Sequence, residues 1–426
     1  MINSKYTTLT ILLSLLFSTT IVGQNFTNSP YTRYGLGELD AQTSVKSRAM
    51  GGVSYAIRDN MQVNFTNPAS YSCADSLSFI FEGGVSFQNS NFSNGSIKKN
   101  AKNASFDYIA MQFRLAPWLG FSAGVIPLSH VGYMMGKVIT NEQNPDNNAT
   151  VTYSGSGGLN QFYGGLSFRP IKSLSVGVNA SYLFGSVSHT MSESFESNTS
   201  AFPFSREATL KAKGMKFDIG AQYTQQINKD NKLTLGVVFS PKHAELNTTG
   251  TIVDVKGNTT TGIVSSSTTE LSKEEATAGI PTSLGVGVAY EWKNKLTVAM
   301  DFMTQKWSDI TYMNNKEAFC DRTKIAFGAE YLPSPFARNY LGAIKYRIGA
   351  YYSLPYYKIN NIRAAKEYGI TAGFSLPLPR TNSKINITGQ YVCMKGADKT
   401  FLDERVLRLC IGVTYNDHWF FKRKVN

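Results

Sequence analysis

The sequence predicts an all-β protein, a transmembrane antiparallel β-barrel of about fourteen strands whose lumen is plugged by an N-terminal hatch. Three observations lead to this prediction. Charged residues are only 17% of the 426-residue chain, which contains 36 Gly, 23 Tyr and 26 Phe. Apolar and small polar residues alternate with a period of two in many short segments. Short turns alternate with longer segments rich in Asn, Ser and Thr, as in outer-membrane barrels.

Residues 1–23 have the features of a secretory signal peptide. Lys5 gives a positive start, and the apolar run "LTILLSLLFSTTIV" ends just before Gly23. This run is short and rich in Ser and Thr, which argues against a transmembrane anchor. We therefore expect export to the outer membrane of a Gram-negative-type bacterium.

The strand pattern is clearest in "LSVGVNASYL", residues 174–183. Val176 and Val178 share one face, and Ser175 and Gly177 share the other. The same alternation recurs at 233–239, 284–290, 296–302, 368–376 and 407–415. One continuous apolar face opposite a face of Gly, Ser, Thr and Asn is typical of a wall between lipid and a polar lumen.

The connections fall into two alternating sets. Short turns are predicted at 115–118, 169–173, 228–232, 291–295, 332–339 and 378–383. Longer loops are predicted around 89–103, 131–157, 191–206 and 247–275, with shorter members near 312–319, 355–361 and 395–400. In outer-membrane barrels the short turns face the periplasm and the longer loops face outward.

Charge, cysteine and histidine placement exclude several classes of protein. The net charge of +13 is scattered along the chain, so we expect no nucleic-acid partner. Cys393 and Cys410 are predicted on opposite faces of neighbouring strands, which excludes a bridge between them. The four histidines are dispersed, and the stretch "YSGSGG" around Ser156 lacks the G-x-S-x-G spacing of a nucleophile elbow, so we predict no metal, no cofactor and no enzyme.

The segment "RAMGGVSYAIRDNMQVNFTNPAS", residues 48–70, has neither the period of a helix nor that of a strand. Gly51 and Gly52 allow close approach of its backbone to a barrel wall. Asn67, Pro68 and Ala69 favour a tight turn held by side chain to backbone hydrogen bonds. The composition changes near residue 76, so we assign 24–76 to a hatch and 77–426 to the barrel.

This segment resembles the N-terminal hatch of the FadL-type outer-membrane transporters of hydrophobic compounds. In that family a glycine-containing run precedes an Asn-Pro-Ala box and a fourteen-stranded barrel. The resemblance implies that extracellular loops capture a small hydrophobic, fatty-acid-like ligand. It also implies that the ligand leaves past the hatch through a lateral opening beside a kinked third strand. Asn67-Pro68-Ala69 could equally serve only to shape a turn.

The third predicted strand, about 118–133, contains Pro127, the candidate for the lateral opening. A proline interrupts ladder pairing, and a strand end or a bulge would explain it equally well. Apolar residues in otherwise polar loops are candidates for ligand capture, although they could instead pack within the loops. These candidates are Tyr133, Met134, Met135, Phe195, Phe202 and Phe204.

Two functions fit these features. The first is an outer-membrane channel for uptake of small hydrophobic molecules, with membrane lipid and that ligand as its partners. The alternative is a non-transporting FadL-like barrel that acts as an accessory or scaffold subunit of an envelope secretion or assembly complex. The chain ends in "HWFFKRKVN" rather than on a bare terminal aromatic, so an assembly signal at 419–421 is expected to be internal.

Overall fold

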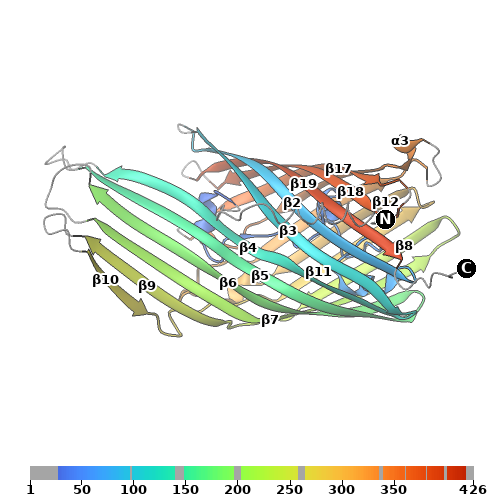
Figure 1. The fold of residues 1–426 in the computed structure, drawn as a ribbon, viewed down its shortest axis with the longest axis horizontal. Helices are drawn as coiled ribbons and strands as arrows, with labels where there is room; N and C mark the ends of the chain where they lie inside the picture. The colour runs from blue at the N-terminus through green and yellow to red at the C-terminus, as the bar shows by residue number, and fades with distance from the viewer. Residues whose placement is uncertain are drawn as a thin grey trace, which may run out of the picture.

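Fourteen antiparallel strands close into a barrel in the computed structural model (Figure 1). The structure describes residues 27–95, 98–139, 148–195, 203–257, 264–334, 339–359, 361–379, 381–397 and 401–418. The predicted fold class is therefore confirmed. The predicted signal peptide, Phe202 and the terminal segment 419–421 lie outside the described residues.

The wall follows chain order. Its strands are β2 (Ser78–Ser93), β3 (Lys98–Ala116), β4 (Leu119–Ile139), β5 (Ala149–Ile171), β6 (Leu174–Phe195), β7 (Phe204–Gln226), β8 (Asn231–Ser240), β11 (Ser283–Trp292), β12 (Leu296–Gln305), β13 (Arg322–Tyr331), β14 (Lys345–Ser353), β17 (Ala365–Pro377), β18 (Lys384–Gly396) and β19 (Asp403–His418). The last strand, β19, pairs with the first, β2, along Asp403–Ser93 to His418–Ser78.

The outward face of the wall is apolar because it meets lipid. Large side chains such as Phe162, Phe217 and Ile370 are 45–64% exposed in the isolated chain. The lumen face carries the glycines and small polar residues that the period-two pattern predicted. Cys393 and Cys410 lie on opposite faces of the sheet. In the ladder of β18 and β19, Cys393 is paired with Arg405 and Cys410 is paired with Thr388. No described helix is long and apolar enough to cross a membrane.

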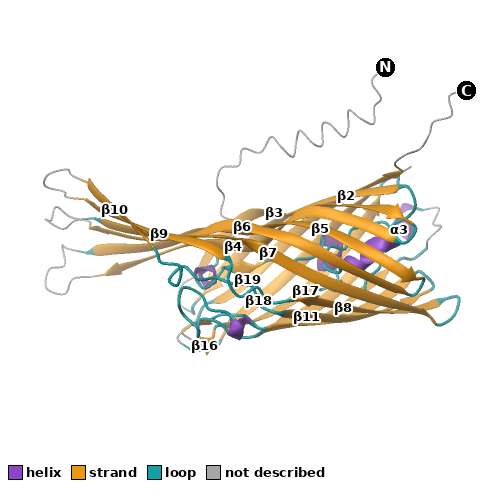
Figure 2. Cartoon of the chain, turned by 90° about the horizontal axis from the view of Figure 1, so that it is seen from below, coloured by secondary structure: helices purple, strands orange, loops and turns teal. Residues whose placement is uncertain are grey.

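The hatch lies inside the barrel, and its short helices are among those that Figure 2 shows enclosed by the strands. Its elements are η1 (Pro30–Arg33), β1 (Glu38–Leu39), α2 (Val45–Arg48) and η2 (Pro68–Cys73). Helix α2 is capped by Ser44, whose side chain accepts from the Ser47 N–H. Short elements joined by turns let the segment follow the inside of the wall, and most of its residues are buried or half-buried.

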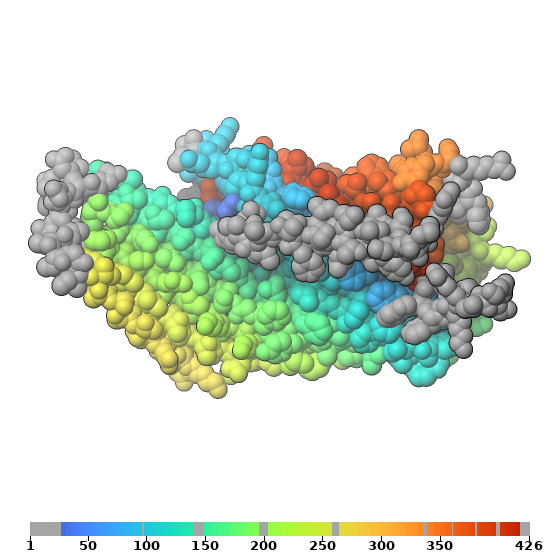
Figure 3. All heavy atoms as spheres, in the orientation of Figure 1, coloured from blue at the N-terminus to red at the C-terminus, as the bar shows by residue number. Residues whose placement is uncertain are grey.

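Strands β4 to β7, together with β9 (Asn247–Gly257) and β10 (Val264–Glu270), continue beyond the rest of the wall (Figure 1 and Figure 3). We call this extension the wing. Much of the predicted loop sequence at 131–157, 191–206 and 247–275 is strand of the wing, and most of 89–103 belongs to β2 and β3, which corrects that prediction. The outward face of the wing carries polar residues such as Lys211, Thr209 and Ser188, so the apolar alternation that marks a strand in the sequence is lost there.

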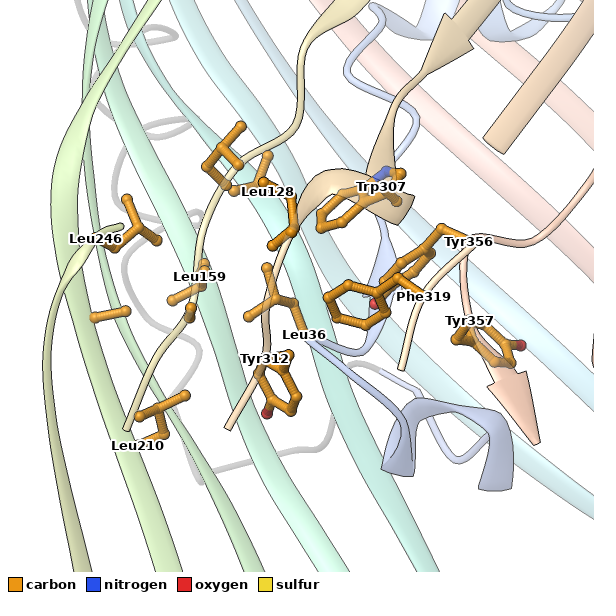
Figure 4. Close-up of a cluster of buried hydrophobic side chains, with 14 of the residues drawn as sticks. Leu36, Leu128, Leu159, Leu210, Leu246, Trp307, Tyr312, Phe319, Tyr356 and Tyr357 are labelled. Carbon is orange, nitrogen blue, oxygen red and sulfur yellow. The ribbon is translucent and has the colours of Figure 1, made fainter. Parts of the chain in front are cut away.

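Connections at the long-loop rim fold inward and fill the upper lumen. They include η3 (Trp307–Asp309) and the hairpin of β15 (Lys358–Ile359) and β16 (Ile362–Arg363); α3 (Tyr340–Ala343) lies at the opposite rim. Trp307, Phe319 and Tyr356 pack together, with ring centroids 4.5–5.4 Å apart. Leu36 of the hatch is 1% exposed within the same cluster (Figure 4). We call this cluster the aromatic cap.

Candidate functional site

The barrel wall is interrupted between its second and third strands. The ladder of β3 and β4 runs from Ala116–Leu119 and ends at Ile109–Val125. Beyond that point β3 continues to pair with β2 as far as Lys98, and β4 continues to pair with β5 as far as Ile139. The upper halves of β3 and β4 are therefore not hydrogen-bonded to each other. We call this the wall break.

Pro127 lies two residues beyond the last β3–β4 pair. Its ring removes the N–H that a ladder bond would need. The register against β5 also shifts between Pro127 and Ser129, which leaves Leu128 as an extra residue. The proline thus lies at a bulge and beside the wall break, in the strand where the sequence placed its candidate lateral opening.

The hatch pairs with the edge of β4 where β3 is missing. Glu38 and Leu39 of β1 lie opposite His130 and Ser129 in antiparallel register. The Asp40 N–H donates to the carbonyl of Leu128, 3.0 Å away. The Gln42 amide donates to the carbonyl of Pro127. The exposed edge of β4 thus obtains its hydrogen bonds from the hatch rather than from the wall.

A buried charge network connects the hatch to both sides of the wall break. Arg48 donates to Asp107 of β3 at 3.0 Å and to Asp40 at 2.8 Å. The other oxygen of Asp40 lies 3.3 Å from His130 Nε2 on β4. Burial opposes ionisation of Asp40, but the adjacent Arg48 guanidinium outweighs it and lowers the pKa of this carboxyl. Burial also disfavours the charged form of Arg48, yet the two carboxylates raise its pKa. The network holds the hatch between β3 and β4 by charge as well as by backbone pairing.

A second ionic connection holds the hatch to the opposite part of the wall. Lys46 pairs with Asp59 within the hatch and lies 4.0 Å from Glu330 of β13. Glu330 also accepts from Arg347 at 2.6 Å and from Lys345 at 2.8 Å. Burial opposes ionisation of Asp59, but Lys46 more than compensates and holds the pKa of that carboxyl well below its usual range. Opposite sides of the lumen are thus joined through the hatch.

The two glycines of the hatch motif meet the wall. Gly51 has a φ of 71° and its N–H donates to the Thr371 hydroxyl at 2.9 Å. A Cβ on Gly51 would lie 2.6 Å from the carbonyl oxygen of Ala350. Gly52, with a φ of 92°, faces the Lys324 ammonium. Only glycine fits both the left-handed backbone and the close approach at Gly51.

The Asn-Pro-Ala box forms the start of η2. The Asn67 side chain accepts from the Ala69 N–H at 3.1 Å and donates to the Tyr55 carbonyl at 2.7 Å. Pro68 is the first residue of this helix, where its missing N–H costs nothing. The wall makes room with Gly220, where a Cβ would lie 2.1 Å from Asn67 Oδ1. The box therefore shapes a turn that is also packed directly on the wall.

Two adjoining cavities, of about 140 and 110 Å³, separate the hatch from the wall. Leu39, Asp40, Arg322 and Lys324 line both. Asp301 lines the larger one and accepts from the Ser54 N–H at 2.6 Å. Charged groups thus border the space next to the wall break, which is unfavourable for an apolar solute.

The structure separates the residues proposed for ligand capture. Tyr133 is 2% exposed, packs in the lumen on Val131 and Val187, and contacts His189 through its hydroxyl at 2.8 Å. Met134 points outward and is 76% exposed. Met135 is partly buried against the Tyr133 cluster, whereas Phe195 and Phe204 are half-buried at the ends of β6 and β7. These residues do not form one groove.

Sequence reasoning missed the charge network. Asp40, Asp107 and His130 lie far apart in the sequence, and nothing in their local pattern marks them as partners of Arg48. Parity gives no signal for Asp107, because this residue is the extra residue of a β-bulge against β2 and Ile109, two residues further on, is 42% exposed on the outward face. A second missed feature is the aromatic cap, because Phe319 and Tyr356 belong to connections predicted as loops.

Solved structures with a similar fold are known. The toluene transporter TodX of Pseudomonas putida superposes with a TM-score of 0.62 at 16% identity, over 90% of this chain and 100% of that chain. The toluene transporter TbuX of Ralstonia pickettii gives 0.58 at 14% identity, over 88% and 98%. A Pseudomonas aeruginosa FadL homologue gives 0.56 at 12% identity, over 88% and 98%. No curated protein matches the sequence significantly.

The fold and the hatch thus define a FadL-like outer-membrane barrel. This confirms the resemblance at the level of fold, and two of these neighbours are described as transporters rather than enzymes. The family itself is a different one. The family model named BamG matches residues 1–426, so the chain belongs to the BamG family.

Proposed function

We propose that this chain is a closed FadL-like barrel that serves as an accessory subunit of an envelope assembly or secretion complex. The filled lumen supports this proposal most directly. The hatch occupies its lower part, and the aromatic cap occupies its upper part, where Trp307 is 2% exposed. Membership of a family named BamG also supports it, because that name points to envelope machinery.

A transport route for an apolar molecule would need continuous apolar surface from the loops to the wall break. The cavities beside the hatch instead present Asp40, Arg322 and Lys324. Neither cavity reaches the several hundred Å³ typical of a drug-sized ligand site. A subunit whose work is done by its outer surface and rim has no need of an open lumen.

Uptake of small hydrophobic molecules is the second candidate, and the wall break is the observation that favours it. In this mechanism extracellular loops capture a fatty-acid-like ligand, which passes the N-terminal hatch and leaves sideways between β3 and β4. β1 would have to detach from β4, which exposes the edge beyond Pro127. The structural neighbours named as toluene transporters are consistent with this route.

A cross-linked hatch would distinguish the two functions. Leu39 and Ser129 are directly opposed residues of β1 and β4, so paired cysteines there can bridge after small adjustments. The experiment is made in a background in which the four native cysteines are replaced by serine. Oxidised and reduced forms are then compared in cells that lack the native protein.

The proposal expects both forms to restore normal levels of outer-membrane proteins and to co-purify with one stoichiometric protein partner in mild detergent. If the chain is instead an uptake channel, the oxidised form should block ligand entry, and reduction of the disulfide should restore ligand entry. A monomer that carries a lipid-like ligand, lost on Asn67→Ala or on deletion of 24–70, would overturn the accessory role.

A further inference from the structure

The outward face of the wing changes its chemistry along β7 in three steps. Phe217 and Met215 are 45% and 40% exposed and belong to the apolar belt. The next two outward residues are Lys213 and Lys211, both exposed. Thr209 follows on the same face. Aliphatic and aromatic surface therefore gives way to positive charge and then to hydroxyl groups within about 27 Å of strand, at roughly 3.3 Å per residue.

The two lysines have no carboxylate partner in the described part of the chain. Across the ladders, Lys213 lies between Phe184 and Asn247, and Lys211 lies between Ser186 and Thr249. Neither lysine forms a salt bridge with a described residue. Two cations side by side above an apolar belt are well placed for phosphate groups at the lipid surface.

Beyond the lysines the outward face is lined with hydroxyl groups on adjacent strands. Ser154 and Ser156 of β5 lie opposite Thr190 and Ser188 of β6, and Thr209 of β7 follows. Ser188 and Thr209 are hydrogen-bonded at 2.8 Å. Strand spacing places such hydroxyls about 4.8 Å apart, so a row can engage several groups of one extended sugar chain. The Glu207 carboxylate on this face lies on the far side of Thr209, from which it accepts at 3.3 Å.

We propose that this face binds a phosphorylated glycolipid of the outer leaflet. Its acyl chains lie on Phe217 and Met215, its phosphate groups meet Lys213 and Lys211, and its sugars lie along the hydroxyl rows. The three chemistries occur in the order in which they occur in such a lipid. The long-loop rim faces outward in barrels of this kind, which places the wing at the outer leaflet. This inference is independent of the function proposed above.

An anionic phospholipid would use the apolar belt and the lysines but not the hydroxyl rows. This difference makes the class of lipid testable. The purified detergent-solubilised protein is titrated with rough lipopolysaccharide, phosphatidylglycerol or phosphatidylcholine and bound lipid is counted by native mass spectrometry. Two variants are compared with the wild type: Lys211→Gln/Lys213→Gln, and Ser188→Ala/Thr209→Val.

Lysines at the short-turn rim supply the matched control. Lys172→Gln/Lys229→Gln removes two exposed charges at the rim that faces away from the outer leaflet. Heat-dependent migration of the folded barrel on a gel establishes that each variant has folded.

We expect the wild type to bind lipopolysaccharide more tightly than phosphatidylglycerol and to bind phosphatidylcholine least. The lysine variant should lose about tenfold in affinity for both anionic lipids, whereas the control should lose none. The Ser188→Ala/Thr209→Val variant should have a lower affinity for lipopolysaccharide and an unchanged affinity for phosphatidylglycerol. Equal affinity of the wild type for both anionic lipids, or an unchanged lysine variant, would overturn the proposal.

Discussion

Arg48 Nη1 lies 3.0 Å from Asp107 Oδ1, and this contact joins the hatch to the strand that borders the wall break. Asp40 of the hatch also pairs with Arg48. The other carboxylate oxygen of Asp40 lies near His130 of β4, the strand on the other side of the wall break. A single buried arginine therefore pairs with one carboxylate of the hatch and one of β3, and the hatch carboxylate in turn lies beside His130 of β4.

Replacement of Arg48 by glutamine should loosen the hatch. It leaves Asp40 and Asp107 buried without their cation, which typically costs about 3–5 kcal/mol for a buried ion pair. We expect a lower thermal midpoint and larger ionic conductance in planar bilayers. Arg206→Gln is the matched control, because its pair with Asp254 is exposed at the wing. A variant with wild-type conductance and stability would show that backbone pairing of β1 suffices to hold the hatch.

Acid should weaken the attachment of the hatch. The pKa of Asp59 is held well below its usual range, with Lys46 as the compensating cation against burial. A carboxyl group whose pKa is lower in the folded than in the unfolded protein stabilises the fold at pH values above its unfolded pKa of about 3.9. This stabilisation is lost as the pH falls below that value. Thermal midpoints should therefore change little between pH 8 and pH 5 and fall below about pH 4. In the Asp59→Asn variant this part of the fall in thermal midpoint should disappear. A variant whose thermal midpoint depends on pH as in the wild type would show that Asp59 does not cause the acid sensitivity.

Glycines of the wall should be needed where the hatch touches them. A Cβ on Gly349 would lie 2.2 Å from the Gly51 nitrogen, whereas one on Gly164 meets nothing within 4 Å. We expect Gly349→Ala to cost about 1–3 kcal/mol through overpacking and to make the hatch sensitive to protease. Gly164→Ala should behave as the wild type. Limited proteolysis followed by mass spectrometry of the N-terminal fragments measures both.

Removal of Trp307 should open the aromatic cap. Trp307 packs on Tyr356 with ring centroids 4.5 Å apart, and truncation of a buried tryptophan to alanine costs about 3–5 kcal/mol. Conductance should rise because the cap closes the upper lumen. Trp118→Ala, at an exposed site of the short-turn rim, supplies the control. A conductance equal to that of the wild type would show that the hatch alone seals the barrel.

The sequence predicted the barrel because lipid imposes a two-residue alternation on each membrane-crossing segment, as in 174–183. It singled out Gly51 and Asn67 because they are residue types with special backbone or capping roles, and in the structure Gly51 has a φ of 71° and the Asn67 side chain caps η2. It failed in the wing, where Thr190 and Ser188 face water and no apolar face is required. It also failed for Asp107 and His130, because a contact between distant strands leaves no trace in local spacing.

The pairing of β19 with β2 has a consequence for biogenesis. These are the last and first strands of the wall, and their seam can form only when the whole chain has been made. The hatch contacts β6, β7, β13 and β14 and is tethered directly to β2. Because this segment packs against strands on opposite sides of the lumen, we expect the sheet to curl around it while the seam is still open. The N-terminal segment thus acts as an internal template for closure of the barrel.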